Sequence, residues 1–371
     1  MPPDVPSFPA LLRPGHIASS RRCLTAGCDL SAYAEYRRNR LGITYYCFGS
    51  IDLLCAMEEI PDSNKEAWRE WIWEQQQTKS ETGSGFRTGT FMTPATPEQT
   101  EAEQTPSYAN YDSPHIIMTY VALLILAMLR DDFSRLDRRG IVKFLGSCQR
   151  PDGSFTTVPR DAEQDLRTLY CAFAICSLLD DWSGIDVERA LTFVESCRTY
   201  EGGYGQSSFC EGHGGITYIA LASIYLAPPE YSKHHLTPAQ KAETTRWLLN
   251  LQHESGGFCG RTNKEADACY CFWSSAALKI LGAGNLFDST RMAEYLASCQ
   301  FKFGGIAKVP GETSDPYHTY LSLAALALYP PDLDESDANA ATWKLDPLDV
   351  LINARESTAA WARQYIPGPR S

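Results

Sequence analysis

Asp267 and Cys269 stand two residues apart in the stretch EADACYCFW, and both residue types can bind a metal ion. In the middle of a helix this spacing would place their side chains on different faces. Both side chains can bind one ion if Asp267 precedes a helix and Cys269 lies in its first turn. Asp is also a favoured N-cap residue, so capping alone is an alternative explanation. With an imidazole nitrogen from His318, the set matches zinc and leaves a fourth position open, as in catalytic sites.

Two cationic residues precede this pair in the stretch CGRTNK. Arg261 offers a planar fork of donors and Lys264 offers a point charge, and both suit phosphate oxygens. Together with His213 and Tyr270 they indicate a diphosphate-binding cluster. The alternative is that both cations are solvated residues of a glycine-rich turn.

Internal repeats indicate the elements that position these residues. Glycine-rich turns recur along the chain, and most are followed by a segment rich in Ala, Tyr and Leu. Six such segments are apolar on nearly every face, which is typical of helices buried on all sides: 40–54, 115–129, 166–179, 213–226, 268–281 and 318–328. Amphipathic stretches alternate with them: 137–149, 186–197, 237–252 and 289–300. The pattern predicts an all-α fold, an α/α toroid in which outer helices surround a barrel of six inner helices.

The same repeat predicts that distant polar residues meet. Each of five residues stands in or near the first turn of an inner segment: His115, Arg167, His213, Cys269 and His318. Successive members are about one repeat apart, and equivalent positions in a closed toroid lie on one rim. The N-termini of the inner helices point to that rim, and their free N–H groups and dipoles favour an anion there.

Aromatic residues on the inner segments face inward by the same periodicity. Tyr46, Tyr120, Tyr170 and Trp273 are the clearest examples. Any one of them alone is explained by core packing. Together, near the mouth of a barrel, they are suited to line a deep apolar tunnel for a hydrocarbon chain.

Charge and composition exclude several classes of protein. The chain has 371 residues and a net charge of −12, which argues against a nucleic-acid or anionic-membrane surface. No secretory signal is expected at its start, and its longest apolar run, 121–129, is too short to span a membrane. The 13 cysteines occur in apolar helical segments, so we expect a reducing compartment, the cytoplasm, and no disulfide framework.

We expect residues 1–371 to form a single domain. Residues 90–112 are rich in Thr, Pro and Glu and are expected to be a surface insertion within one repeat. The two ends, roughly 1–15 and 330–371, contain much Pro and Asp and are expected to be irregular or peripheral.

Three longer stretches resemble the signature stretches of protein prenyltransferase beta subunits: GRTNKEADACYCFW, EGHGGITYIAL and SDPYHTYLSLAAL. The resemblance covers about residues 36–328. Four others are most similar to the type I geranylgeranyltransferase branch: YDSPHIIMTY, DDFSRLD, DDWSGIDVERAL and GGIAKVPG. The resemblance implies a subunit that pairs with a helical-repeat alpha subunit. It would transfer geranylgeranyl from geranylgeranyl diphosphate to the cysteine thiol of proteins with a C-terminal CaaX sequence, such as Rho-type small GTPases.

The resemblance also implies roles for individual residues. Asp267, Cys269 and His318 would hold one Zn²⁺, with the substrate thiol as its fourth ligand. The residues implied for diphosphate are His213, Arg261, Lys264, Tyr270 and Lys308. Those implied for the isoprenoid are Gly42, Tyr46, Tyr120, Arg167, Tyr170 and Trp273. Those implied for the peptide are His115, Ile117 and Thr168.

Two positions distinguish the branches of the family. Gly42 stands where the farnesyl branch has a tryptophan that closes the tunnel, so glycine leaves room for a fourth isoprene unit. Lys308 stands where the farnesyl branch has an aspartate that binds magnesium, so we expect catalysis without Mg²⁺. Ile117 and Thr168 differ from the alanine and phenylalanine of the animal pattern near the pocket for the last peptide residue.

Four alternatives remain at this point. A Rab-type geranylgeranyltransferase beta subunit and a farnesyltransferase beta subunit share the family pattern. A terpene cyclase on the same toroid would need an acidic protonation motif on the rim. A toroidal binding module without enzymatic activity would need no metal.

Overall fold

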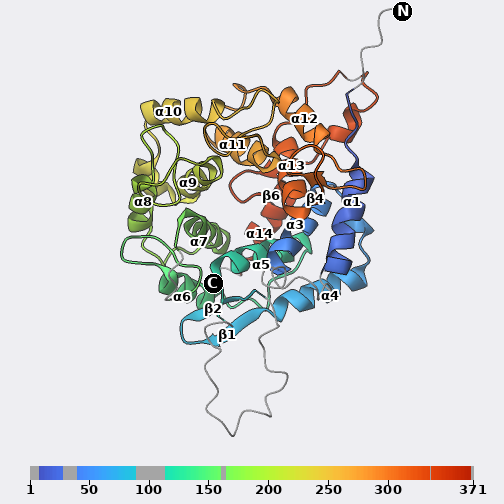
Figure 1. Ribbon diagram of the computed structural model, residues 1–371. Coiled ribbons are helices and arrows are strands. Elements are labelled where there is room, and N and C mark those ends of the chain that lie inside the picture. Colours follow the sequence, from blue (N-terminus) through green and yellow to red (C-terminus); the bar gives the residue numbers. More distant parts are fainter. Residues whose placement is uncertain (1–7, 28–39, 89–112, 160–163, 335, 369–371) are drawn as a thin grey trace, which may run out of the picture.

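Six helices form a closed inner ring in the computed structural model, which describes residues 8–27, 40–88, 113–159, 164–334 and 336–368. They are α3 (Arg40–Leu53), α5 (Ile116–Met128), α7 (Leu166–Leu179), α9 (Gly214–Leu226), α11 (Ala268–Ile280) and α13 (Pro316–Leu328). Each contacts the next, and α13 contacts α3, so the ring closes (Figure 1). The α/α toroid predicted from the apolar segments is confirmed. The expected insertion at 90–112 lies outside the described residues.

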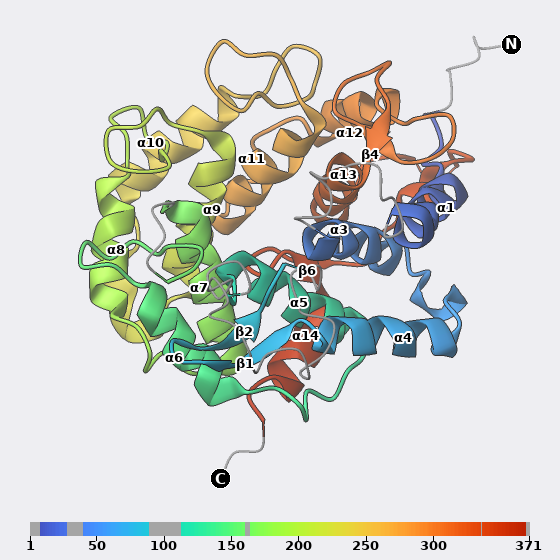
Figure 2. The ribbon, with the colours of Figure 1, turned by 60° about the horizontal axis from the view of Figure 1, so that its bottom comes forward.

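A second layer of helices surrounds the ring (Figure 2). Its members are α1 (Arg13–Arg22), α4 (Asp62–Trp73), α6 (Arg138–Cys148), α8 (Val187–Ser196), α10 (Pro238–Leu249) and α12 (Ser289–Ser298). Most of these helices are amphipathic and bury one face against the inner helices. An aspartate N-cap accepts a backbone N–H at the start of α6, α8 and α12, which sets where these helices begin.

The inner helices all begin at the same rim. Their N-cap residues occupy equivalent repeat positions: His115 for α5, Asp165 for α7, His213 for α9, Asp267 for α11 and Asp315 for α13. Except for His115, each of these side chains accepts a backbone N–H of the first turn. The polar residues that the repeat aligned in sequence therefore do lie around one mouth of the ring.

Glycine is required in the turns that join outer to inner helices because the backbone there adopts left-handed conformations. Gly256, for example, has φ +94°, and a Cβ on it would lie 2.2 Å from the carbonyl oxygen of Arg291 in α12. Such a contact is shorter than any packing allows, so the turn cannot accept a side chain. This requirement explains why the glycine-rich turns recur with the repeat.

Short antiparallel hairpins complete the described fold. β1 (Gln76–Ser80) pairs with β2 (Gly83–Phe86) beside α6, with Gln76 opposite Phe86. β3 (Ile306–Ala307) pairs with β4 (Ser314–Asp315) just before α13. β5 (Leu348–Asp349) pairs with β6 (Ala354–Arg355) and leads into α14 (Glu356–Tyr365). No helix in the described part of the chain is long and apolar enough to cross a membrane.

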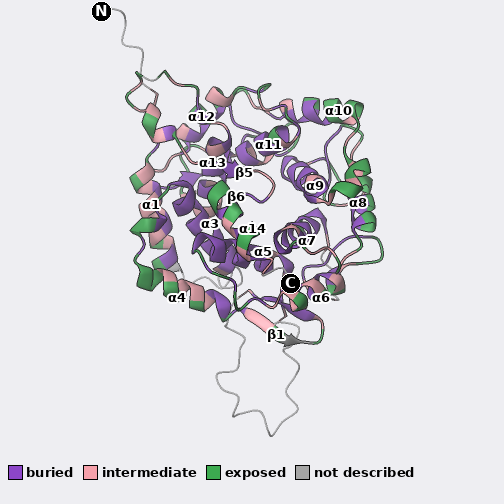
Figure 3. Cartoon of the chain, turned by 180° about the vertical axis from the view of Figure 1, so that it is seen from behind, coloured by how far each residue is buried: buried purple, intermediate pink, exposed green. Residues whose placement is uncertain are grey.

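The ends of the described chain are less peripheral than expected. Seen from behind, the β5–β6 hairpin lies inside the ring of inner helices, and buried residues surround it (Figure 3). Ile352 and Trp343 are fully buried, and at the other end Leu11, just before α1, is only 2% exposed. The reason is that these segments satisfy polar groups of the ring, which no local sequence pattern reveals.

Candidate active site

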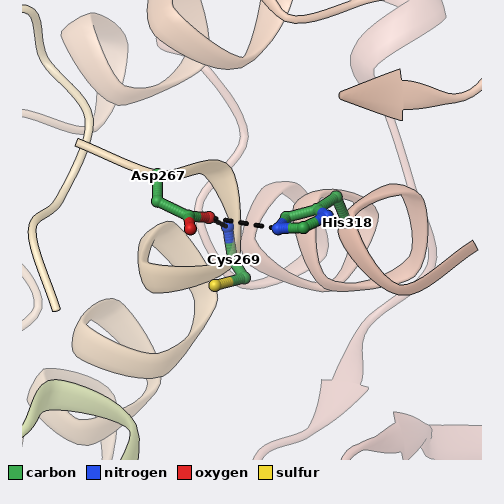
Figure 4. Close-up of side chains that lie close together, drawn as sticks. All are labelled: Asp267, Cys269 and His318. Carbon is green, nitrogen blue, oxygen red and sulfur yellow. Dashed lines mark hydrogen bonds and ion pairs between the residues drawn. The ribbon is translucent and has the colours of Figure 1, made fainter. Parts of the chain in front are cut away.

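Asp267, Cys269 and His318 lie together where α11 and α13 begin (Figure 4). Each offers one ligand atom, and these three atoms lie within 4.8 Å of one another. An Asp267 oxygen is 3.3 Å from Nε2 of His318 and accepts a hydrogen bond from the backbone N–H of Cys269 at 2.9 Å. Asp267 thus precedes its helix and Cys269 lies in the first turn, which is the geometry that their spacing required.

The donor set fits a cation such as Zn²⁺. A carboxylate oxygen, a thiol sulfur and an imidazole nitrogen are the ligand types that zinc prefers. Burial, followed by the negative charge of Asp267, raises the pKa of the Cys269 thiol well above its ordinary value. Burial opposes charge on His318, yet its hydrogen bonds to Asp267 and Asp315 raise its pKa to about 9. Asp267 contributes to both shifts through its negative charge, in second place after burial for Cys269, and a bound cation would neutralise that charge.

Asp315 holds His318 in place and was not singled out by the sequence analysis. As the N-cap of α13, Asp315 accepts the backbone N–H of His318 at 2.9 Å and contacts Nδ1 of its ring at 2.6 Å. This contact leaves Nε2 directed at Asp267, an arrangement that commonly supports metal-binding histidines. The spacing Asp-x-x-His at a helix start was the available signal.

His213 and Tyr270 form a hydrogen-bonded pair at the neighbouring helix start. Nδ1 of His213 accepts the backbone N–H of Gly215 at 3.2 Å, so the proton of a neutral ring lies on Nε2. Nε2 lies 3.0 Å from the hydroxyl of Tyr270. Burial, then the charge of Arg261, lowers the pKa of His213, and burial raises that of Tyr270 to about 12. Near neutral pH His213 is therefore a neutral ring that can donate through Nε2, and Tyr270 keeps its hydroxyl proton.

Three cationic residues stand around this pair. Arg261 is exposed and forms an ion pair with Glu211 at 2.9 Å, a contact worth at most about 1 kcal/mol at a solvated surface. Lys264 is exposed in the same turn. Lys308 is exposed at the end of β3, and its carbonyl accepts the N–H of Ala268 at 2.9 Å, which places it beside the start of α11. These three cations lie on loops near the start of α11, at the same mouth of the ring, where they would attract a bound anion.

The aromatic residues predicted for a lipid wall fall into two levels. Tyr46 and Trp273 are partly exposed, and both contact Tyr317, a residue that the sequence analysis missed. The Trp273 indole N–H donates to the Tyr317 hydroxyl at 3.1 Å, and the Tyr46 and Tyr317 rings are 5.3 Å apart. Tyr120 and Tyr170 lie deeper, and their hydroxyls donate to backbone carbonyls of the C-terminal segment.

The other predicted isoprenoid residues stand closer to the rim. Gly42 is buried in the first turn of α3, which is three helices around the ring from α9 and therefore faces it. Arg167, in the first turn of α7, pairs with the carboxylate of Asp165 at 2.6 Å. Gly42 and His213 thus lie on opposite sides of the ring.

The residues predicted for peptide binding do not share one environment. His115 caps α5, and its backbone N–H donates to the carbonyl of Phe86. Ile117, in the first turn, is partly exposed. Thr168 is buried, and its hydroxyl donates to the carbonyls of Phe155 and Asp165 as part of a capping box. Its side chain therefore serves the fold of α7, which argues against a direct peptide contact.

Comparison with known proteins agrees with this fold. Residues 11–354 match the family model of the prenyltransferase alpha-alpha toroid domain. The chain therefore belongs to the prenyltransferase family that this toroid defines.

Within that family the chain is similar to beta subunits of geranylgeranyl transferase type-1. It is 35% identical to the Dictyostelium discoideum subunit over 307 residues, which cover 80% of this chain and 85% of that one. It is 39% identical to the Arabidopsis thaliana subunit over 226 residues, which cover 59% of this chain and 60% of that one. The solved structure of Candida albicans protein geranylgeranyltransferase-I complexed with GGPP has the same fold, with a TM-score of 0.78, 24% identity and coverage of 96% and 99%.

Proposed function

We propose that this chain is the catalytic beta subunit of a protein geranylgeranyltransferase of type I. It would act in the cytoplasm with an alpha subunit and transfer geranylgeranyl to CaaX proteins. The observation that carries the proposal is that the Asp267, Cys269 and His318 cluster shares one rim with the His213 and Tyr270 pair. The names of the Dictyostelium and Arabidopsis relatives favour this branch over the farnesyl, Rab-type and terpene cyclase alternatives.

The residues of the first cluster would hold one Zn²⁺ beside the incoming protein. Bound there, zinc would supply Lewis acidity that lowers the pKa of a cysteine thiol, so that a thiolate is present at neutral pH. Asp315 would keep Nε2 of His318 turned toward the ion. The thiolate sulfur would attack C1 of the lipid diphosphate while the bond from C1 to oxygen breaks.

Residues of the second cluster would receive the leaving diphosphate. His213 and Tyr270 would donate hydrogen bonds to the oxygens on which negative charge builds up. Arg261 and Lys264 would add positive charge, with Arg261 exchanging Glu211 for the diphosphate. Lys308 would add a fixed cation beside the start of α11, which supports catalysis without Mg²⁺.

The test is a transfer assay with the purified heterodimer and a CaaX peptide that ends in Leu. We expect geranylgeranyl to be transferred without added Mg²⁺ and in preference to farnesyl. Gly42→Trp should shift the choice toward farnesyl, because an indole side chain in the first turn of α3 would fill space across the ring from His213. Metal analysis should find zinc in the wild type and little in Cys269→Ala.

Two outcomes would reject parts of the proposal. A wild-type enzyme that needs a Rab escort protein before any transfer occurs would be of the Rab type. Absence of zinc from the active wild type would rule out the metal cluster, and an unchanged lipid choice in Gly42→Trp would show that Gly42 does not control chain length.

A further inference from the structure

An acidic side chain, Glu211, stands among the cations of the proposed diphosphate site. Glu211 lies two residues before His213, the N-cap of α9, and its side chain is 58% exposed. Its carboxylate contacts the Arg261 guanidinium at 2.9 Å. A negative charge beside an anion site opposes the binding of an anion, so Glu211 affects how tightly the site holds diphosphate.

The backbone next to Arg261 is fixed against both neighbouring inner helices. The carbonyl of Gly260 accepts the N–H of Gly214 in the first turn of α9 at 2.8 Å. A Cβ on Gly260 would lie 2.2 Å from a ring carbon of Tyr270, so this backbone packs directly on that side chain of α11. Arg261 therefore extends from a fixed base beside the pair of His213 and Tyr270, and only the direction of its side chain can change.

Of the three cations at the mouth, Arg261 is the one that has a carboxylate partner within the part of the chain that the structure describes. Lys264 and Lys308 are exposed, and neither forms an ion pair with another described residue. The two lysines can therefore attract an anion at all times, whereas Arg261 must leave Glu211 to bind one. An exposed ion pair of this kind is weak, so the exchange is readily reversible.

The leaving group gains negative charge during the proposed reaction. As the thiolate sulfur bonds to C1 of the lipid, the bond from C1 to oxygen breaks and its electron pair stays on that diphosphate oxygen. Free diphosphate therefore carries more negative charge than its lipid ester, and the proposed reaction uses no Mg²⁺ to offset it. Because repulsion between like charges grows with their size, Glu211 opposes the bound product more than the bound substrate.

We propose that Glu211 promotes the release of free diphosphate, because it competes with diphosphate for Arg261 and repels its negative charge. The inference rests on the proposed function, because it needs a diphosphate leaving group. Glu211 acts through Arg261 and touches no reacting atom, so it is a positioning residue. When the product leaves, the ion pair between Glu211 and Arg261 forms again, and the site returns to the arrangement seen in the structure.

The experiment compares the binding of inorganic diphosphate to the wild-type heterodimer and to Glu211→Gln, measured by competition with geranylgeranyl diphosphate in the absence of Mg²⁺. We expect Glu211→Gln to bind inorganic diphosphate about fivefold more tightly, the factor for the loss of one exposed charge interaction. Its dissociation should slow by a similar factor, since changes in affinity at one site act mostly on dissociation rates. The Kd for geranylgeranyl diphosphate should fall less than about twofold, because the ester carries less charge. Since salt screens exposed charges, the difference between the two proteins should shrink at high ionic strength.

Two further variants separate the charge of Glu211 from the general effect of such a substitution. Glu211→Asp keeps the carboxylate, so its affinity for inorganic diphosphate should stay within about twofold of the wild type. Glu59→Gln is the matched control, because Glu59, which follows the far end of α3, forms an ion pair with Arg21 at the same distance of 2.9 Å and is 57% exposed. It should bind inorganic diphosphate like the wild type.

Unchanged or weaker binding of inorganic diphosphate by Glu211→Gln overturns the proposal, and weaker binding would mean that Glu211 only orients Arg261. A gain in affinity that Glu59→Gln shares would come from the loss of net charge and would also overturn it. A wild type that transfers no geranylgeranyl rejects the proposed function itself. A wild type that transfers geranylgeranyl but gives either of the first two outcomes rejects the role of Glu211 alone.

Discussion

At the scale of single residues, the chemistry of the candidate site depends on which ring nitrogen of His318 and of His213 can bind a ligand. Asp315 contacts Nδ1 of His318 and leaves Nε2 for the cluster, while the backbone of Gly215 contacts Nδ1 of His213 and leaves Nε2 for Tyr270. Both rings therefore present Nε2 toward the mouth. The two roles differ because His318 lies among carboxylates and His213 lies near Arg261.

Asp315→Asn tests the role of the carboxylate behind His318. We expect zinc affinity to fall by roughly 10- to 100-fold, because an amide supports the imidazole ring less strongly than a carboxylate does. Competition with a chelator measures the affinity. Asp288→Asn is the matched control, since Asp288 caps α12 in the same way without touching the cluster. Equal zinc affinity in Asp315→Asn and the wild type would contradict the assigned role.

At the scale of elements, α1 is fastened to the turn before β3 by one buried histidine. Nδ1 of His16 accepts the N–H of Gly305 at 2.9 Å, and Nε2 donates to the side chain of Gln300 at 3.0 Å. The backbones meet closely here, because a Cβ on Gly304 would lie 1.9 Å from the carbonyl oxygen of Gly15. The backbones of Gly15 and Gly304 therefore pack directly against each other, and the His16 side chain supplies the hydrogen bonds that join α1 to this turn.

The His16 contact predicts acid sensitivity. Burial lowers the pKa of His16 from 6.5 to about 4, and the Gln300 bond offsets only part of this effect. Between these values the unfolded chain binds more protons than the folded protein, so the free energy of unfolding decreases as pH falls from 6.5 toward 4. The loss approaches roughly 3 kcal/mol at the lower limit.

Urea unfolding at several pH values measures this effect. His16→Gln removes the titrating group, so its stability should depend less on pH in this window, whatever its stability at neutral pH. His253→Gln, the same substitution at a partly exposed histidine in another turn, is the matched control for the substitution itself. Identical pH slopes for His16→Gln and the wild type would assign the acid sensitivity to other groups.

At the scale of the whole molecule, the rim carries exposed aromatic residues beside the proposed site. Tyr200 and Phe209 are 94% and 107% exposed. Phe209 also has φ +66°, a left-handed backbone conformation that is energetically unfavourable for any residue other than glycine. Both line a surface hollow of about 640 Å³ together with Glu211, the partner of Arg261. The proposed function pairs this chain with an alpha subunit, and we predict that the alpha subunit occupies this hollow.

Phe209→Asp should weaken association with the alpha subunit about tenfold or more, since a charge would replace an aromatic anchor. Co-purification and a titration of the two subunits measure the effect. Leu286→Asp is the control, because Leu286 is also exposed but follows α11 at the opposite end of the ring. If both variants bind the alpha subunit like the wild type, the hollow is not part of the subunit interface.

The sequence by itself determined the toroid, because fully apolar and amphipathic helices alternate and each repeat has its own glycine turn and N-cap. It also aligned Asp267, Cys269, His213 and His318 on one rim, since equivalent repeat positions meet when the ring closes. Only the tertiary structure decided the position of the C-terminal hairpin. The hydrogen bonds from tyrosine hydroxyls to its backbone carbonyls join residues up to 308 positions apart, as from Tyr45 to Asn353. Because every residue has a backbone carbonyl, the sequence does not indicate which carbonyls accept these bonds.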